Sequence, residues 1–195
     1  LRDDARLSYD FVNKNRVTKP LINNEGLLEE VTWEEAISFS ASKLDNFKGD
    51  QIVFVASSKA SNEDNYIFNK FANEISNTQN VIYYSHTDES RVDDLLGVAD
   101  MTPNTKGVEE LGIGKDSHIK ADELAAKLKN GEIRAMYVME EDFEDYPEIL
   151  EQLGNLSFLA VHSYNSNKKI NNLADVVFPA STFAEIEGTY TNLNG

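Results

Sequence analysis

The sequence Ile52-Val-Phe-Val-Ala56, followed by the loop Ser57-Ser-Lys-Ala-Ser-Asn62, decides the fold class of this chain. Five consecutive apolar residues of strand length predict a β-strand that is covered on both faces. A helix is expected next, because Ser61 or Asn62 can cap it and apolar residues then recur at helical spacing as far as Ile75. This strand, loop and helix indicate an α/β fold.

The same alternation of elements extends along the chain in both directions. Thr32 and Glu35 form a predicted capping box at the start of a helix expected over about 33–47. Further strands are predicted over 81–84, 135–139, 157–161 and 175–178, with helices over about 122–129 and 147–153. The pattern predicts a doubly wound, mostly parallel sheet with helices on each face, joined by right-handed crossovers.

The turn-forming residues suggest how the chain is divided. Residues 1–31 are expected to form an N-terminal arm with a short hairpin, because Pro20, Asn23-Asn24 and Gly26 mark a turn. Residues 32–195 are expected to form a single α/β domain. It would contain two half-sheets, about 32–114 and 121–195, joined by a short polar linker that ends in Lys115–Lys120.

The composition excludes several classes of function. Lys and Arg number 18 against 34 Asp and Glu, and the net charge of −16 makes nucleic acid and anionic lipid poor partners. The chain has no cysteine, so it can hold neither a disulfide nor a thiolate-bound iron–sulfur cluster. No apolar run reaches the roughly 18 residues of a membrane-spanning helix. We therefore expect no direct membrane insertion and a cytoplasmic location.

Three blocks of sequence resemble the molybdopterin oxidoreductase superfamily, which includes formate dehydrogenases and the G subunit of NADH:quinone oxidoreductase. They are Arg6–Ile22 with Val31–Ile37, then Ala56–Tyr66, and finally Ala174–Asn192. In that fold a further α/β domain is inserted between the two half-sheets. Here the segment Pro103-Asn-Thr-Lys-Gly107 is retained, and the returning half begins shortly after Gly112. The resemblance therefore implies the central domain of the formate dehydrogenase fold with its usual inserted middle domain missing.

The resemblance also supplies candidate binding residues. In the resembled enzymes the loop after the first buried strand approaches a molybdopterin guanine dinucleotide. The equivalent positions here are vestigial cofactor or anion-binding candidates, as are two positions in the last block: Ser57, Ser58, Lys59, Ser61, Asn62, Thr189 and Asn192. Free helix amides and a lysine could hold a phosphate. In the alternative interpretation, Ser61 and Asn62 only cap a helix.

Other positions argue against a bound cofactor. The resemblance implies a glycine after the strand that ends at Met139, but the chain has Glu140-Glu-Asp-Phe-Glu-Asp145, whose carboxylates would repel a pyrophosphate. These acids are interpreted as a solvated face, with Asp145, Glu148 and Glu151 in the first turn of a helix. His86 falls in the region of the molybdenum ligand but is interpreted as a surface or loop histidine. We therefore predict no catalytic residue, metal ligand or cofactor in this chain, including the iron–sulfur clusters of the family.

Three hypotheses of function remain. In the first, the chain is a cofactor-free structural scaffold domain of an NADH:quinone oxidoreductase G-type subunit. The second is a fragment of a formate-dehydrogenase-like catalytic subunit, and the third is an α/β module that binds a small anion at Ser57–Asn62. The expected partners are other subunits or domains of an oxidoreductase complex. Weak self-association is also expected, through an apolar patch near Tyr83, Phe143 and Phe183.

Overall fold

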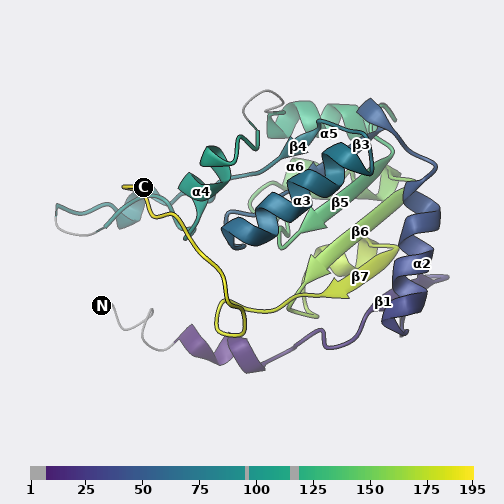
Figure 1. Ribbon diagram of the computed structural model, residues 1–195, viewed down its shortest axis with the longest axis horizontal. Helices are drawn as coiled ribbons and strands as arrows, with labels where there is room; N and C mark the ends of the chain where they lie inside the picture. The colour runs from purple at the N-terminus through teal and green to yellow at the C-terminus, as the bar shows by residue number, and fades with distance from the viewer. Residues whose placement is uncertain (1–7, 95–96, 115–118) are drawn as a thin grey trace.

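A computed structural model describes residues 8–94, 97–114 and 119–195, and Figure 1 shows the arrangement of its helices and strands. Seven strands form one sheet in the order β2-β1-β7-β6-β5-β3-β4. The parallel strands are β3 (Ile52–Val55), β4 (Val81–Ile82), β5 (Ala135–Met139), β6 (Phe158–Ser163) and β7 (Val176–Pro179). The predicted fold class, an α/β fold with a mostly parallel sheet, is confirmed.

A hairpin near the N-terminus adds two antiparallel strands to this sheet. Strand β1 (Leu21–Asn24) pairs with β2 (Leu27–Glu30) on one side and with β7 on the other, where Leu21 is opposite Val177. In the turn, Gly26 has a φ of 92° and its amide donates to Asn23 Oδ1 at 2.8 Å. The hairpin therefore extends the edge of the sheet that the rest of the chain builds.

Helices cover both faces of the sheet, as Figure 1 shows. The helices α2 (Trp33–Leu44), α3 (Asn62–Glu74) and α4 (Thr105–Glu110) pack in one apolar cluster, which includes Ile52 and Phe54 of β3. The helices α5 (Ala121–Lys129) and α6 (Pro147–Leu150) pack in a second cluster, which includes Val53 and Val55. Successive side chains of a strand point to opposite faces, so β3 contributes to both cores.

Several element boundaries differ from the sequence prediction for identifiable reasons. The capping box of Thr32 and Glu35 is present, but α2 ends at Leu44, where the Asn46 side chain donates to the Ser42 and Lys43 carbonyls. Strand β4 ends at Ile82, and the buried Tyr84 donates its hydroxyl to the Ile119 carbonyl at 3.1 Å. Short 3-10 helices complete the chain at Ser8–Asn13, Gly49–Gln51, Glu89–Arg91, Leu153–Asn155 and Lys169–Leu173.

Arg16, in the first of the resembling blocks, makes contact with residues of the last block. Its guanidinium lies 2.7 Å from the Glu185 carboxylate and donates to the Ala180 carbonyl at 3.2 Å. This guanidinium, together with the amide and hydroxyl of Thr182, lowers the pKa of Glu185 to about 2. Residues 169 positions apart in the sequence therefore hold the two ends of the described chain together.

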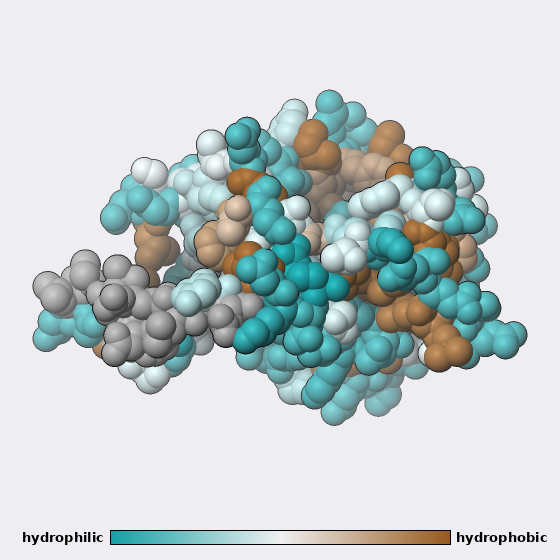
Figure 2. Space-filling model, turned by 90° about the horizontal axis from the view of Figure 1, so that it is seen from below, coloured by the Kyte–Doolittle hydropathy of each residue, from teal (hydrophilic) through white to brown (hydrophobic). Residues whose placement is uncertain are grey.

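The apolar patch predicted near Tyr83, Phe143 and Phe183 does not exist as proposed. Phe143 is fully buried in the core with a φ of 55°, whereas Phe183 is 64% exposed. Tyr83 is half-buried and donates to Glu109 Oε1 at 3.2 Å. Figure 2 shows hydrophobic residues in several groups on the face seen from below, and one group lies on the side of α2 and β1. Exposed apolar side chains of this region include Leu27, Trp33 and Ile37.

The described segments contain no helix that is both long enough and apolar enough to cross a membrane. Residues 115–118 of the predicted linker lie outside the part of the chain that the structure describes.

Candidate functional site

The loop between β3 and α3 lies at the carboxyl ends of the parallel strands, where ligands of open α/β sheets bind. The hydroxyl groups of Ser57 and Ser61 take part in local hydrogen bonds. Ser61 is the N-cap of α3, because its Oγ accepts the Asp64 amide at 3.1 Å and donates to the Asp64 carboxylate at 2.6 Å. Ser57 Oγ accepts the Lys59 amide, and the Ser57 amide donates to Asn65 Oδ1. These contacts fit the capping interpretation of the loop.

The last block of sequence closes over the N-terminus of α3. The Asn62 amide donates to the Thr189 carbonyl at 2.9 Å, and the Thr189 amide and hydroxyl donate to the two carboxylate oxygens of Glu63. The Thr189 amide lowers the pKa of Glu63. The structure thus brings Thr189 to the predicted loop. Asn192 instead accepts the Asn194 amide in an exposed turn near Gly195.

Asn104 is a central residue of this arrangement that the sequence indicated only as part of a turn. It is fully buried, and its side chain donates to the Ala60 carbonyl at 2.8 Å and accepts the Thr191 amide at 2.8 Å. The Asn104 amide donates to the Ser58 carbonyl at 3.0 Å. A Cβ atom at Gly107 would overlap Asn62 Oδ1 and Asn104 Oδ1, so only glycine fits there. In the sequence, the turn motif at 103–107 was the one feature that pointed to Asn104.

Glu140 occupies the position at which the resemblance implies a glycine, and its backbone keeps a glycine-like φ of 52°. The side chain is half-buried and lines two cavities of about 440 and 520 Å³. Burial, with a smaller contribution from Asp64, raises the pKa of Glu140 to about 7, and Lys59 opposes this shift. The Glu140 carboxylate makes no hydrogen bond or ion pair with the residues that the structure describes.

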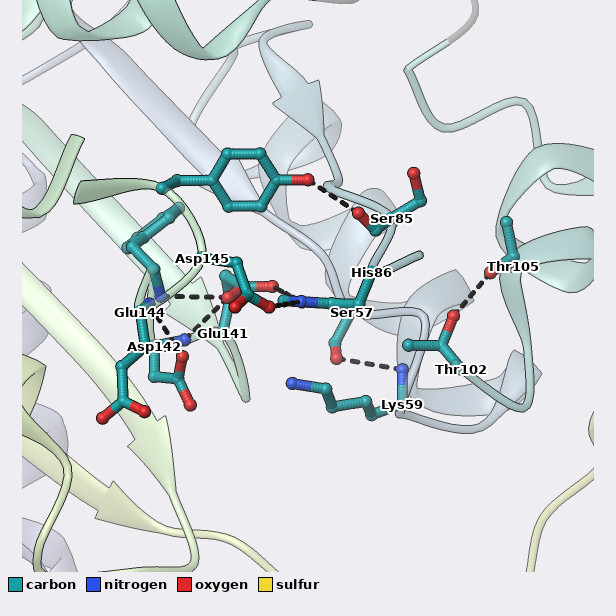
Figure 3. A network of polar contacts seen from close by, with 12 residues as sticks. Ser57, Lys59, Ser85, His86, Thr102, Thr105, Glu141, Asp142, Glu144 and Asp145 are labelled. Carbon is teal, nitrogen blue, oxygen red and sulfur yellow. Dashed lines mark hydrogen bonds and ion pairs between the residues drawn. The ribbon is translucent and has the colours of Figure 1, made fainter. Parts of the chain in front are cut away.

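The positions of Glu141 and Asp145 show that the predicted solvated acidic face is wrong for part of the 140–145 run. Glu141 is 4% exposed, and its Oε1 accepts the amides of Asp142 and Phe143. Its Oε2 lies 2.7 Å from His86 Nε2, and Asp145 Oδ2 lies 2.6 Å from His86 Nδ1 (Figure 3). Asp145 therefore pairs with the histidine and lies before the first residue of α6, not in its first turn as predicted.

His86 is a loop residue, as predicted, but it is not a free surface histidine. Its side chain is 10% exposed and lies between the two carboxylates. Both ring nitrogens can donate only in the imidazolium form. The hydrogen bond to Glu141 is the main cause that raises the pKa of His86, against the opposing effect of burial. Sequence reasoning missed this cluster because its members lie 55 and 59 positions apart.

Cations also hold the acidic loop. Lys168 Nζ lies 2.6 Å from Asp142 and 3.6 Å from Glu144. Figure 3 shows the Lys59 side chain extending toward the same loop. In the described ranges, no group of three His, Asp or Glu side chains could hold a metal ion.

The residues of this edge do not fit the pyrophosphate of a pterin dinucleotide. The amides of Asn62 and Asp64, in the first turn of α3, are already bonded to Thr189 and Ser61. The carboxyl groups of Glu63 and Asp64 lie at the same helix end, and Glu140 lines the neighbouring cavity. Carboxylates repel phosphate, and a helix end with two of its first-turn amides already bonded offers it less compensation.

A family model described as molybdopterin oxidoreductase matches residues 16–105 and 97–195. The chain belongs to this family. Among curated relatives, a putative formate dehydrogenase of Bacillus subtilis is 42% identical over 82 residues, which cover 40% of this chain and 8% of the relative. An F420-dependent formate dehydrogenase subunit alpha of Methanocaldococcus jannaschii is 43% identical over 74 residues, or 37% of this chain and 11% of the relative. The aligned part of this chain spans about a tenth of the length of these relatives.

Proposed function

We propose that this chain is a cofactor-free structural domain of an oxidoreductase complex, of the kind found in the G subunit of NADH:quinone oxidoreductase. In this role the chain retains the family fold and contributes protein–protein surface, and other subunits carry the electrons. Its partners would be the other subunits or domains of that complex, at a cytoplasmic position peripheral to the inner membrane.

One observation carries the proposal, namely the unpaired carboxyl group of Glu140 at the edge where a family cofactor would place its phosphates. Bringing a phosphate next to a half-buried carboxylate costs electrostatic energy in a region of low dielectric constant. Protonation of Glu140 removes the repulsion but offers only one hydrogen bond in exchange. The exposed apolar residues Trp33 and Ile37 on α2 are consistent with a partner surface.

A second candidate function is part of a formate-dehydrogenase-like catalytic subunit. It is favoured by the relatives, which include a putative formate dehydrogenase and alpha subunits of F420-dependent formate dehydrogenases. In that case residues outside this chain would hold the cofactor. The third hypothesis, a small-anion site at the 57–62 loop, is less favoured because Glu63 and Asp64 occupy that helix end.

Metal and cofactor analysis of the purified chain tests the first candidate. We expect neither molybdenum nor tungsten in more than trace amounts, and no pterin in the denatured extract. The matched control is a curated formate dehydrogenase relative, expressed in the same host with molybdate. Molybdenum and pterin near one equivalent in the purified chain would refute the proposal.

Isolation of the tagged full chain from its native cells separates the two candidates. Cross-linking followed by mass spectrometry should recover NADH:quinone oxidoreductase subunits, with cross-links at Lys43 or Lys70 on α2 and α3. Recovery of formate dehydrogenase subunits at the same lysines would favour the second candidate instead.

A further inference from the structure

The 440 Å³ cavity at the carboxyl edge of the sheet contains two polar groups that have no hydrogen-bond partner among the residues that the structure describes. Its lining consists of Lys59, Pro103, Glu140, Tyr164, Thr182, Phe183 and Tyr190. The Tyr190 hydroxyl is buried without a hydrogen-bond partner, and the Glu140 carboxyl also has none in the described chain. A buried polar group without a partner is unfavourable, so the buried Tyr190 hydroxyl and the half-buried Glu140 carboxyl in one cavity indicate a missing ligand.

The charged groups around Glu140 indicate the sign of the charge on that ligand. Burial raises the pKa of Glu140, and the charge of Asp64 on α3 raises it further. Burial is also the main cause that raises the pKa of Tyr190, and the charges of Glu140, Asp64 and Glu63 add to it. The one cation of the lining is Lys59, and its side chain extends toward the acidic loop (Figure 3). The side of the cavity around Glu140 therefore favours a cation.

The walls define the shape of the ligand. Tyr164, Phe183 and Tyr190 supply three aromatic rings, and a flat cation can lie against an aromatic face. A guanidinium group is flat, remains charged and has a row of N–H donors that match a carboxylate. An ammonium group lacks the flat shape, and an apolar ligand would leave both polar groups without partners.

We propose that this cavity binds an alkylguanidinium group, with its N–H donors on the Glu140 carboxylate and the Tyr190 hydroxyl and its plane against the aromatic walls. The group could come from a free small molecule or from an arginine side chain of a partner protein, and the chemistry of recognition is the same. The ligand has the opposite charge to the phosphates of the family cofactor. This binding site would be the same in any oxidoreductase complex that contains the chain.

Binding should strengthen as the pH rises, because the cation needs Glu140 in its ionised form. With a pKa of about 7, Glu140 is roughly one-tenth ionised at pH 6 and nine-tenths ionised at pH 8, so affinity should rise about tenfold.

Calorimetric titration of the full chain with methylguanidinium tests the proposal. We expect saturable binding that is about tenfold tighter at pH 8 than at pH 6. Glu140→Gln should abolish the pH dependence and weaken binding at pH 8 by at least about tenfold. The matched control Glu144→Gln removes the same charge from the exposed part of the loop and should bind like the wild-type chain.

Tyr190→Phe provides a second variant in case Glu140→Gln folds poorly, and it should weaken binding about threefold to tenfold through one lost hydrogen bond. The blocked peptide acetyl-Gly-Arg-Gly-amide distinguishes the two sources. Binding at least as tight as that of methylguanidinium favours a partner's arginine, and clearly weaker binding favours a free ligand. The proposal is wrong if methylguanidinium does not saturate at pH 8, if Glu140→Gln binds equally well, or if acetate binds more tightly.

Discussion

Replacement of His86 by Asn should destabilise the fold, because it removes the cation between two carboxylates. His86 lies in the loop after β4, whereas Glu141 and Asp145 follow β5, so the cluster connects two segments at the carboxyl edge. Asparagine is too short to reach both carboxylates. The buried Glu141 would keep only its backbone amide donors.

The two contacts should contribute unequally to the free energy of unfolding. The Asp145 side chain is 71% exposed, so its pair with His86 is worth about 0–1 kcal/mol. The Glu141 side chain is only 3% exposed, and removal of its cationic partner should cost about 2–3 kcal/mol, the amides of Asp142 and Phe143 limiting the loss. Asp145→Asn should therefore have a small effect, and His86→Asn a large one.

The effect should depend on pH in one direction. The folded-state pKa of His86 is raised above its usual value, so its contribution is fully present below the unfolded-state pKa of about 6.5. It is then lost as the pH rises through the folded-state pKa. The stability difference between wild type and His86→Asn should therefore be largest near pH 5.5 and should shrink as the pH rises through the raised folded-state pKa of His86.

Urea denaturation at several pH values, followed by tryptophan fluorescence of Trp33 and by circular dichroism, measures this difference. Subtraction of the two stabilities cancels the background repulsion from the net charge of −16, which both chains share apart from His86. A difference below about 0.5 kcal/mol near pH 5.5 would refute the reasoning, as would a difference that grows with pH. So would equal losses for Asp145→Asn and His86→Asn.

Three further outcomes are expected. Glu140→Gly should raise stability more at pH 8 than at pH 4, by about 1–2 kcal/mol, because the raised pKa of Glu140 costs stability only above pH about 4.5, whereas relief of the left-handed backbone is the same at both pH values; urea denaturation at pH 4 and pH 8 measures the difference. Asn104→Ala should lower the free energy of unfolding by about 2–3 kcal/mol and speed proteolysis after residue 185, because Asn104 bonds to both Ala60 and Thr191, whereas the exposed Asn73→Ala should do neither; equal cleavage rates would contradict this role of Asn104. The chain should self-associate weakly through the exposed Phe183, more at high than at low salt because salt screens the repulsion between chains, and Phe183→Ser should reduce the associated fraction measured by sedimentation. A strict monomer at both salt concentrations would contradict this prediction.

Much of the sheet could be predicted because each buried strand corresponds to a short run of apolar residues. The apolar runs at 52–56, 135–139 and 157–161 correspond to β3, β5 and β6, each buried on both faces. The capping box before α2 and the cap at Ser61 were also evident, since each depends on residues within one helical turn. Such elements can be predicted from sequence because capping and strand burial depend on residues that are close together in the chain.

The candidate site was harder to predict because its contacts are long-range. No local pattern indicates that Asn104 bonds to both Ala60 and Thr191, or that His86 pairs with the loop after β5. The run 140–145 looks like a solvated acidic face, since its composition is the same whether Glu141 points outward or inward. Whether Glu141 points outward or inward is decided only by where the strand ends place the loop.

Glu140 combines two features that the isolated chain does not explain. A left-handed backbone costs a residue with a side chain about 1 kcal/mol, and burial of an unpaired carboxyl group costs more. Replacement by glycine would remove both costs without moving the backbone, since the φ of 52° is already one that glycine prefers. A glutamate that is unfavourable in the folded chain is explained if its carboxylate meets a donor that the chain itself does not supply. The cavity beside it, with aromatic walls and the unpaired Tyr190 hydroxyl, is where that donor would lie.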